Sequence, residues 1–195
     1  MKQSWLKLAG MFAFGLLFRL LPFRPPNVEL IMASQMPVAK TYGKLAGFFF
    51  GAFSILAFDV LTGTPGPWSL VTAPTYGLLG VFAAWYLKNR HGKRHFAYFA
   101  LFGTLLYDAI TGLTVGPLFF HQPFLAAVLG QIPFTFMHLL GNIGFAIILS
   151  PMIERWLAPQ IVLVYSKHQI PGAKFQTISN VKSPKFSNED SAFVI

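Results

Sequence analysis

The sequence has no cysteine and few charged residues. The absence of cysteine from all 195 residues excludes disulfide bonds, thiol catalysis and cysteine metal sites. Aspartate and glutamate together number six, and charged residues make up 11% of the chain, which is less than half of the roughly 25% typical of soluble domains. The hydrophobic share is 54% and the mean hydropathy is +0.56. This composition predicts an integral membrane protein.

The motifs of common enzyme classes are also missing. There is no nucleophile elbow, no His-Glu-x-x-His sequence, no Gly-rich phosphate-binding loop and no pair of carboxylates within one helical turn. His91 and His95 lie in a basic segment and are interpreted as solvated side chains. The sequence therefore predicts a protein that is not an enzyme. Without a nucleotide-binding motif, any ATP-driven step requires a partner protein.

Six apolar segments predict an all-α fold of six transmembrane helices. They lie at about 5–21, 28–41, 43–61, 70–88, 96–112 and 123–150. With the N-terminus inside, all of the 15 lysine and arginine residues except Arg19 and Arg24 fall on the cytoplasmic side. This bias predicts a cell-membrane protein with both termini cytoplasmic. It also explains the net charge of +9 without a nucleic-acid partner.

The predicted helices occupy residues 1–158, which we expect to form a transmembrane substrate-binding domain. Residues 159–195 are polar and basic and lack sustained periodicity, so they predict a flexible cytoplasmic tail.

The second segment allows two interpretations. It holds Glu29, Gln35 and Pro37 and is short for a full crossing. Either neighbouring helices shield it inside the membrane, or it is a re-entrant or surface helix. The charge bias of the later segments favours a full crossing.

A short motif occurs twice, 49 residues apart. Asp59 and Asp108 each follow an aromatic residue and precede a Thr-Gly pair and then a Gly-Pro pair. The offset matches two membrane helices with their connections. We expect both copies to form outward-facing loops at the ends of parallel helices, so that segments three and four and segments five and six form repeated hairpins. The two aspartates either bind a ligand or shape these loops.

The last segment carries a polar stripe. Gln131, Thr135, His138 and Asn142 recur at helical spacing, so they lie on one face, which must point into the bundle. We expect the first two to line an outward-facing pocket and the last two to tie helices together.

Several stretches carry a resemblance to a known family. They are Arg19–Pro22, Pro26–Glu29, the helix end Ser54–Asp59, and Gly66–Leu70 leading into Thr75–Gly80. Over roughly residues 5–155 the chain resembles the substrate-binding S components of energy-coupling factor (ECF) transporters. The resemblance implies capture of a vitamin or related micronutrient on the outer face. It also implies two kinds of partner: a membrane coupling (T) protein and a pair of cytoplasmic ATPases.

The resemblance places the ligand site in the outer halves of the later helices and their outer loops. The candidates are Asn27, Glu29, Asp59, Trp68, Thr72, Tyr76, Asp108, His121 and Gln131. Ala9 and Ala13 form the small-residue pair expected to contact the coupling protein, although such pairs also mediate ordinary helix packing. Position 2 is lysine where the cobalt and nickel subgroup has a metal-binding histidine, so we expect no metal substrate and no cofactor.

The acids together with Trp68 and Tyr76 suit a stacked, partly cationic ring, such as a deazapurine or a thiamine-like compound. Two other functions stay open. One is a non-transport membrane scaffold of cell-envelope morphogenesis, and the other is a self-sufficient facilitator for a small solute.

Overall fold

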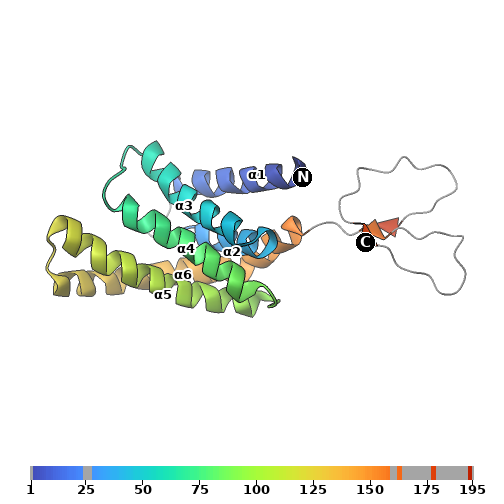
Figure 1. Cartoon of the computed structure of the whole chain (residues 1–195). Helices are drawn as coiled ribbons and strands as arrows, with labels where there is room; N and C mark the ends of the chain where they lie inside the picture. Colours follow the sequence, from blue (N-terminus) through green and yellow to red (C-terminus); the bar gives the residue numbers. More distant parts are fainter. Residues whose placement is uncertain (1, 24–27, 159–161, 164–176, 179–192, 195) are drawn as a thin grey trace, which may run out of the picture. The chain divides into compact units, whose positions relative to one another are not determined.

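The computed structural model describes residues 2–23, 28–158, 162–163, 177–178 and 193–194. Six helices follow one another along the chain (Figure 1). They are α1 (Lys2–Arg19), α2 (Ile31–Tyr42), α3 (Lys44–Leu61), α4 (Ser69–Leu87), α5 (Lys93–Phe120) and α6 (Phe124–Leu157). These helices form one unit, Lys2–Leu157, which confirms the predicted all-helical class.

The residues after Leu157 belong to a second unit. Its described parts are three short strands, β1 (Val162–Leu163), β2 (Thr177–Ile178) and β3 (Phe193–Val194). They pair antiparallel in the order β2-β1-β3. Most of the predicted flexible tail, 159–195, lies outside the described residues.

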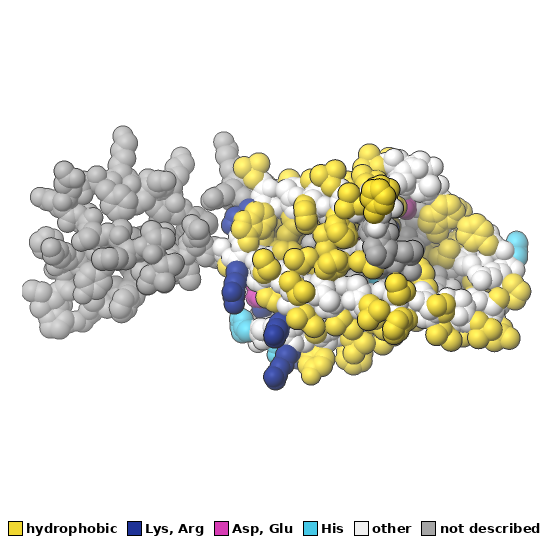
Figure 2. Space-filling view, turned by 180° about the vertical axis from the view of Figure 1, so that it is seen from behind, with side chains coloured by type: hydrophobic (Ala, Val, Ile, Leu, Met, Phe, Trp, Pro, Cys, Tyr) yellow, Lys and Arg dark blue, Asp and Glu magenta, His cyan; other side chains and the backbone are white. Residues whose placement is uncertain are grey.

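Four of the described helices, α3 to α6, are long and apolar enough to cross a membrane. Their outward side chains are largely apolar, and examples are Phe102, Leu140 and Leu70, whose exposed fractions are 66%, 58% and 77%. Figure 2 shows apolar side chains over most of the visible face of the helical unit, with lysine and arginine gathered at one end. Such a surface is stable when lipid covers it. The protein is therefore a multi-pass membrane protein, while six crossings and cytoplasmic termini remain predictions.

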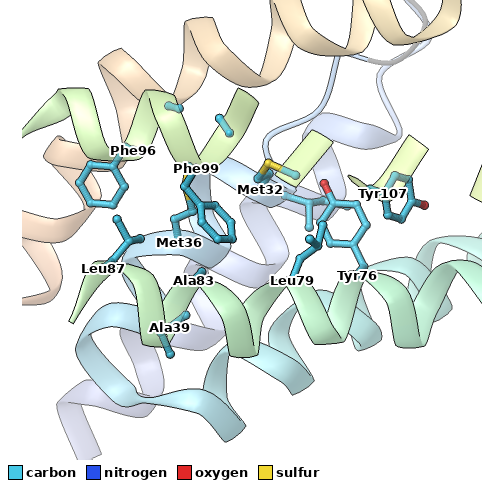
Figure 3. Close-up of a cluster of buried hydrophobic side chains, with 14 of the residues drawn as sticks. Met32, Met36, Ala39, Tyr76, Leu79, Ala83, Leu87, Phe96, Phe99 and Tyr107 are labelled. Atoms are coloured by element: carbon cyan, nitrogen blue, oxygen red, sulfur yellow. The ribbon is translucent and has the colours of Figure 1, made fainter. Parts of the chain in front are cut away.

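The shortest helix lies at the centre of the bundle. Residues 31–39 of α2 are all buried, and α3, α4 and α6 pack around them. Gln35 is buried, and its Nε2 donates to the carbonyls of Gly47 (2.9 Å) and Tyr76 (2.8 Å). The hydrophobic core beside it joins α2, α4 and α5 through Met32, Leu79 and Phe99 (Figure 3). Helix α2 is thus enclosed by its neighbours, and it is not a surface helix.

Glycine allows α3 and α4 to touch through their backbones. A Cβ atom on Gly80 would lie 2.2 Å from the carbonyl oxygen of Gly47, and one on Gly47 would lie 2.7 Å from the carbonyl oxygen of Gly80. Only residues without a side chain fit at this crossing. The crossing holds the Gln35 amide against both helices.

The two copies of the aspartate motif adopt different structures. In the first, α3 ends at Leu61 and Gly63 takes a positive φ of 68°, so the predicted loop is confirmed. In the second, the predicted helix end at residue 112 is wrong, because α5 continues through Gly112 and Pro117 to Phe120. The Thr-Gly pair of this copy is helical, and Asp108 lies within α5 and not at its end.

Candidate functional site

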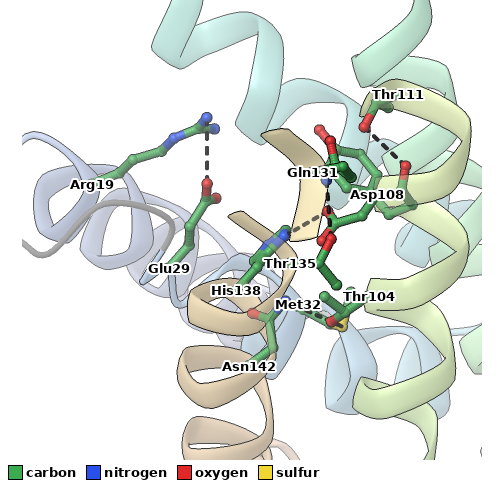
Figure 4. Close-up of polar contacts among 11 residues, drawn as sticks. Arg19, Glu29, Met32, Thr104, Asp108, Thr111, Gln131, Thr135, His138 and Asn142 are labelled. Atoms are coloured by element: carbon green, nitrogen blue, oxygen red, sulfur yellow. Dashed lines mark hydrogen bonds and ion pairs between the residues drawn. The ribbon is translucent and has the colours of Figure 1, made fainter. Parts of the chain in front are cut away.

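Two hydrogen bonds join α5 to α6 inside the bundle. Asp108 on α5 and His138 on α6 are both buried, and Oδ1 of the carboxylate lies 2.7 Å from Nδ1 of the imidazole. One helical turn away, Nδ2 of Asn142 donates to Oγ1 of Thr104 at 2.8 Å. Figure 4 shows these side chains between the two helices. The prediction that His138 and Asn142 tie helices together is confirmed.

The other end of the stripe also faces α5. Nε2 of Gln131 donates to Oγ1 of Thr135 at 3.0 Å. The carbonyl of Gln131 lies so close to Gly112 that a Cβ atom there would meet Oε1 at 1.7 Å. Any side chain at position 112 would therefore displace the Gln131 amide from its place against α5.

An ion pair lies at the junction of α1 and the segment before α2. The Arg19 guanidinium is 3.7 Å from a Glu29 carboxylate oxygen, and both side chains are largely buried. The guanidinium also lies over the Phe58 ring, 4.0 Å from its centre. Figure 4 shows the pair on the side of α6 away from α5. Among the described residues, Glu29 is the acid that pairs with Arg19.

Aromatic rings connect α4 with the Asp108–His138 pair. The buried Tyr76 ring lies 4.8 Å from the Tyr107 ring, and Tyr107 in turn lies 5.9 Å from the His138 ring. Phe134 packs on His138 from the same helix, at 5.8 Å. Val28, the neighbour of Glu29, packs on α6 beside Asn142, because a Cβ atom on Gly141 would lie 3.1 Å from its Cα atom. The two polar pairs and the two tyrosines therefore belong to one region, which we call the central polar cluster: Arg19, Glu29, Tyr76, Thr104, Tyr107, Asp108, His138 and Asn142.

Many polar atoms of this cluster have no hydrogen-bond partner. Among the described residues, the buried atoms of the cluster without one are Arg19 Nε and Nη1, Glu29 Oε2, Tyr76 Oη, Asp108 Oδ2, His138 Nε2 and Asn142 Oδ1. Buried polar groups in proteins are nearly always paired. A concentration of unpaired donors and acceptors beside aromatic rings is the chemistry of a site for a polar heterocyclic ligand.

Other predicted site residues have local contacts instead. Asp59 is buried, and its Oδ2 accepts a hydrogen bond from Oγ of Ser69 at 2.6 Å, which fixes the α3–α4 loop. Trp68 stacks on Phe120 with ring centres 5.8 Å apart, and Thr72 donates to the Trp68 carbonyl at 3.0 Å. These contacts hold the Asp59 carboxylate in the α3–α4 loop.

The remaining predicted residues are placed as follows. His121 is exposed and ends α5 in a left-handed conformation, with φ of 52°. Ala9 and Ala13 are exposed on α1. Asn27 lies outside the described residues. Of the predicted ligand residues, Glu29, Tyr76 and Asp108 meet in the central polar cluster, and Gln131 lies on the same stripe.

Sequence reasoning missed two parts of the cluster. Tyr107 is the aromatic residue of the second motif copy, so the repeat itself contained the signal. Thr104 lies four residues before Asp108 on the same helical face, and that spacing was the available clue. Among the described residues no group of histidine, aspartate and glutamate could hold a metal ion.

A surface groove offers a contrast to the cluster. It is bounded by α1, α2 and α6, has a volume of about 350 Å³, and is lined mainly by apolar side chains such as Met11, Phe14 and Met152. A groove with so few polar groups offers little to orient a polar ligand. The central polar cluster is therefore the candidate ligand site.

Comparison with known proteins gave one family. The model described as "ECF-type riboflavin transporter, S component" matches residues 8–178. No curated protein and no solved structure matches the chain. The matched range contains every residue of the central polar cluster.

Proposed function

The chain belongs to the family of ECF-type riboflavin transporter S components, and from this we propose that its central polar cluster captures a flavin-like micronutrient for import. As a member of this family it is a membrane substrate-binding subunit and not a member of an enzyme family. The family's name replaces the deazapurine and thiamine-like compounds with riboflavin as the leading candidate substrate.

The observation that carries this proposal is the group of buried, unpaired polar atoms beside Tyr76 and Tyr107. A flavin ring has a broad aromatic face that suits tyrosine side chains. Its polar edge presents two carbonyl groups on either side of an N–H group. The unpaired Nε and Nη1 of Arg19 are donors for a carbonyl, and the unpaired Oε2 of Glu29 is an acceptor for the N–H. A site that matches such an edge discriminates strongly against analogues that lack it.

We assign delivery to partners. In this proposal a membrane coupling protein and two cytoplasmic ATPases drive import, and α1 contacts the coupling protein through Ala9 and Ala13. Both alanines are exposed on α1, which leaves them available for close helix packing. The helical domain, residues 1–158, holds the ligand, and residues 159–195 form the cytoplasmic tail. Both termini are cytoplasmic, and the protein lies in the cell membrane.

The basic end of the bundle favours capture over a self-sufficient pathway. Lys40 at the end of α2 is nearly buried and bonds Glu154 of α6 at 2.5 Å. Its Nζ also donates to the carbonyl of Arg90 at 2.5 Å and lies 5.7 Å from the centre of the Phe96 ring. These contacts tie α2, α5, α6 and the α4–α5 loop together at the basic end of the bundle. A facilitator needs an opening at this end through which its solute can leave.

Ligand binding tests the proposal directly. The protein is purified in lipid nanodiscs, and the fluorescence of riboflavin is titrated with it, next to a deazapurine and thiamine as competitors. Saturable quenching is expected for riboflavin, because a bound flavin ring contacts tyrosine side chains. If no flavin binds, or if thiamine or the deazapurine displaces it at equal concentration, the flavin assignment is rejected.

Transport separates the remaining hypotheses. Vesicles that contain this protein are compared with vesicles that also contain the coupling protein and ATPases. We expect riboflavin uptake only with the complete set and ATP. Uptake by the chain alone would identify a facilitator. Absence of uptake in both kinds of vesicle, together with co-purification of partners that are not ATPases, would favour the scaffold.

A further inference from the structure

The α5–α6 side of the cluster presents unpaired atoms of a single kind. Asn142 uses Nδ2 to bond Thr104, which leaves its carbonyl Oδ1 free, and Asp108 uses Oδ1 for His138, which leaves Oδ2 free. A carboxylate only accepts hydrogen bonds, so Nδ1 of His138 carries the hydrogen between them. In a neutral imidazole Nε2 is then an acceptor, and it is also unpaired. The free atoms of Asp108 and Asn142 therefore require donors, and so does Nε2 of His138 when the imidazole is neutral.

These acceptors are deeply buried and regularly spaced. The exposed fractions of Asp108, His138 and Asn142 are 1%, 2% and 0%. Asn142 follows His138 by four residues, and its partner Thr104 precedes Asp108 by four. The two levels of the ladder are therefore about 6 Å apart along the helices. A buried acceptor without a donor is unfavourable, so a ligand that supplies donors at both levels gains affinity from this face.

We propose that this ladder holds a polyol chain: hydroxyl groups of the ligand donate to Asp108, His138 and Asn142 along the α5–α6 seam. The inference rests on the proposed function, since riboflavin joins such a chain to its ring system. Hydroxyls on neighbouring carbons provide several donors within one helical turn, and each hydroxyl rotates to meet its acceptor. The ring then lies against Tyr76 and Tyr107, toward Arg19 and Glu29. The polyol is thereby the part of the ligand that this ladder selects.

The test compares riboflavin with lumiflavin, which has the same ring system and a methyl group in place of the polyol. Both are titrated against the wild-type protein in nanodiscs. Two or three buried hydrogen bonds, each worth about a factor of ten, predict that lumiflavin binds about 100- to 1,000-fold more weakly. This comparison needs no variant, so it does not depend on how a substitution folds.

A variant assigns the difference to the ladder. Asn142→Leu removes one acceptor and keeps the branching and the number of side-chain heavy atoms, and we expect riboflavin to bind about tenfold more weakly while lumiflavin is unaffected. Asp59→Asn is the matched control, because Asp59 bonds Ser69 in the outer loop; it should leave the ratio of the two affinities unchanged. A purely structural effect of Asn142→Leu would weaken both flavins equally.

The outcomes distinguish the two claims. Equal affinity of the wild-type protein for both flavins overturns the polyol ladder and leaves flavin capture in place. The same holds if Asn142→Leu weakens both flavins by the same factor. Failure of both flavins to bind overturns flavin capture, and the ladder with it.

Discussion

Replacement of Gly80 by alanine tests the packing that holds the cluster in place. The added Cβ atom would lie 2.2 Å from the carbonyl oxygen and 2.3 Å from the carbonyl carbon of Gly47, and 2.5 Å from Nε2 of Gln35. Backbone atoms cannot rotate away as the end of a long side chain can, so α3 and α4 must separate. Separation breaks the Gln35 bonds to the carbonyls of Gly47 and Tyr76.

The magnitude follows from three contributions. Overpacking costs about 1–3 kcal/mol, and the two lost hydrogen bonds cost about 1 kcal/mol each. The higher helix propensity of alanine offsets about 1 kcal/mol. The net loss in the free energy of unfolding is thus about 2–4 kcal/mol, or a fall of roughly 5–15 °C in the thermal midpoint on the scale of domains of this length.

Thermal unfolding of the purified protein, followed by tryptophan fluorescence in detergent, measures this change. Gly144→Ala is the control, because Gly144 also lies within a helix but a Cβ atom there has nothing within 4 Å. The control should retain the wild-type midpoint or exceed it. If the thermal midpoint of Gly80→Ala equals that of Gly144→Ala, the close backbone contact between α3 and α4 is refuted.

Three further predictions concern binding, coupling and the basic end. Asp108→Asn should weaken riboflavin binding about tenfold, because a charged acceptor is lost. Asp59→Asn should leave the affinity unchanged but make the α3–α4 loop more susceptible to proteolysis. Unchanged affinity in both variants rejects a ligand role for the acids. Ala13→Trp should abolish co-purification of the coupling protein and ATPases while ligand binding persists, and loss of both would indicate a damaged fold. Lys40→Met should destabilise the protein by about 1–2 kcal/mol because Glu154 loses its partner. A second substitution, Glu154→Gln, should then restore part of the lost thermal midpoint. An unchanged midpoint in Lys40→Met would show that Lys40 does not stabilise the basic end of the bundle.

The helices that sequence predicts best are those whose ends coincide with strong local signals. Helix α3 was expected at 43–61 and occupies Lys44–Leu61, since a glycine precedes it and the Thr-Gly-Thr-Pro run follows it. Helix α5 was predicted eight residues too short at its end, although the same kind of signal occurs there. Contacts that the local pattern does not show accompany the difference. Gly112 lies against the Gln131 side chain of α6, and Gly116 lies against the Gln122 side chain of the α5–α6 loop.

The site shows the same limit. Helical spacing predicts that Gln131, His138 and Asn142 lie on one inward face of the last helix, and in the structure all three side chains face α5. Spacing within one helix does not reveal the register of its neighbour, so the partners Asp108 and Thr104 could not be assigned. For the same reason the sequence does not distinguish Asp59 from Asp108, whereas in the structure Asp59 bonds Ser69 and Asp108 bonds His138.

The buried position of α2 has a consequence for how the protein enters the membrane. Its 12 residues are about 18 Å long, against a hydrocarbon layer of about 30 Å. The partners of its Gln35 are carbonyls of α3 and α4, which the ribosome makes afterwards. During synthesis α2 therefore has neither the length nor the hydrogen bonds to remain stably in lipid by itself. The centre of the bundle is encoded early and settles late, when the helices that surround it have arrived.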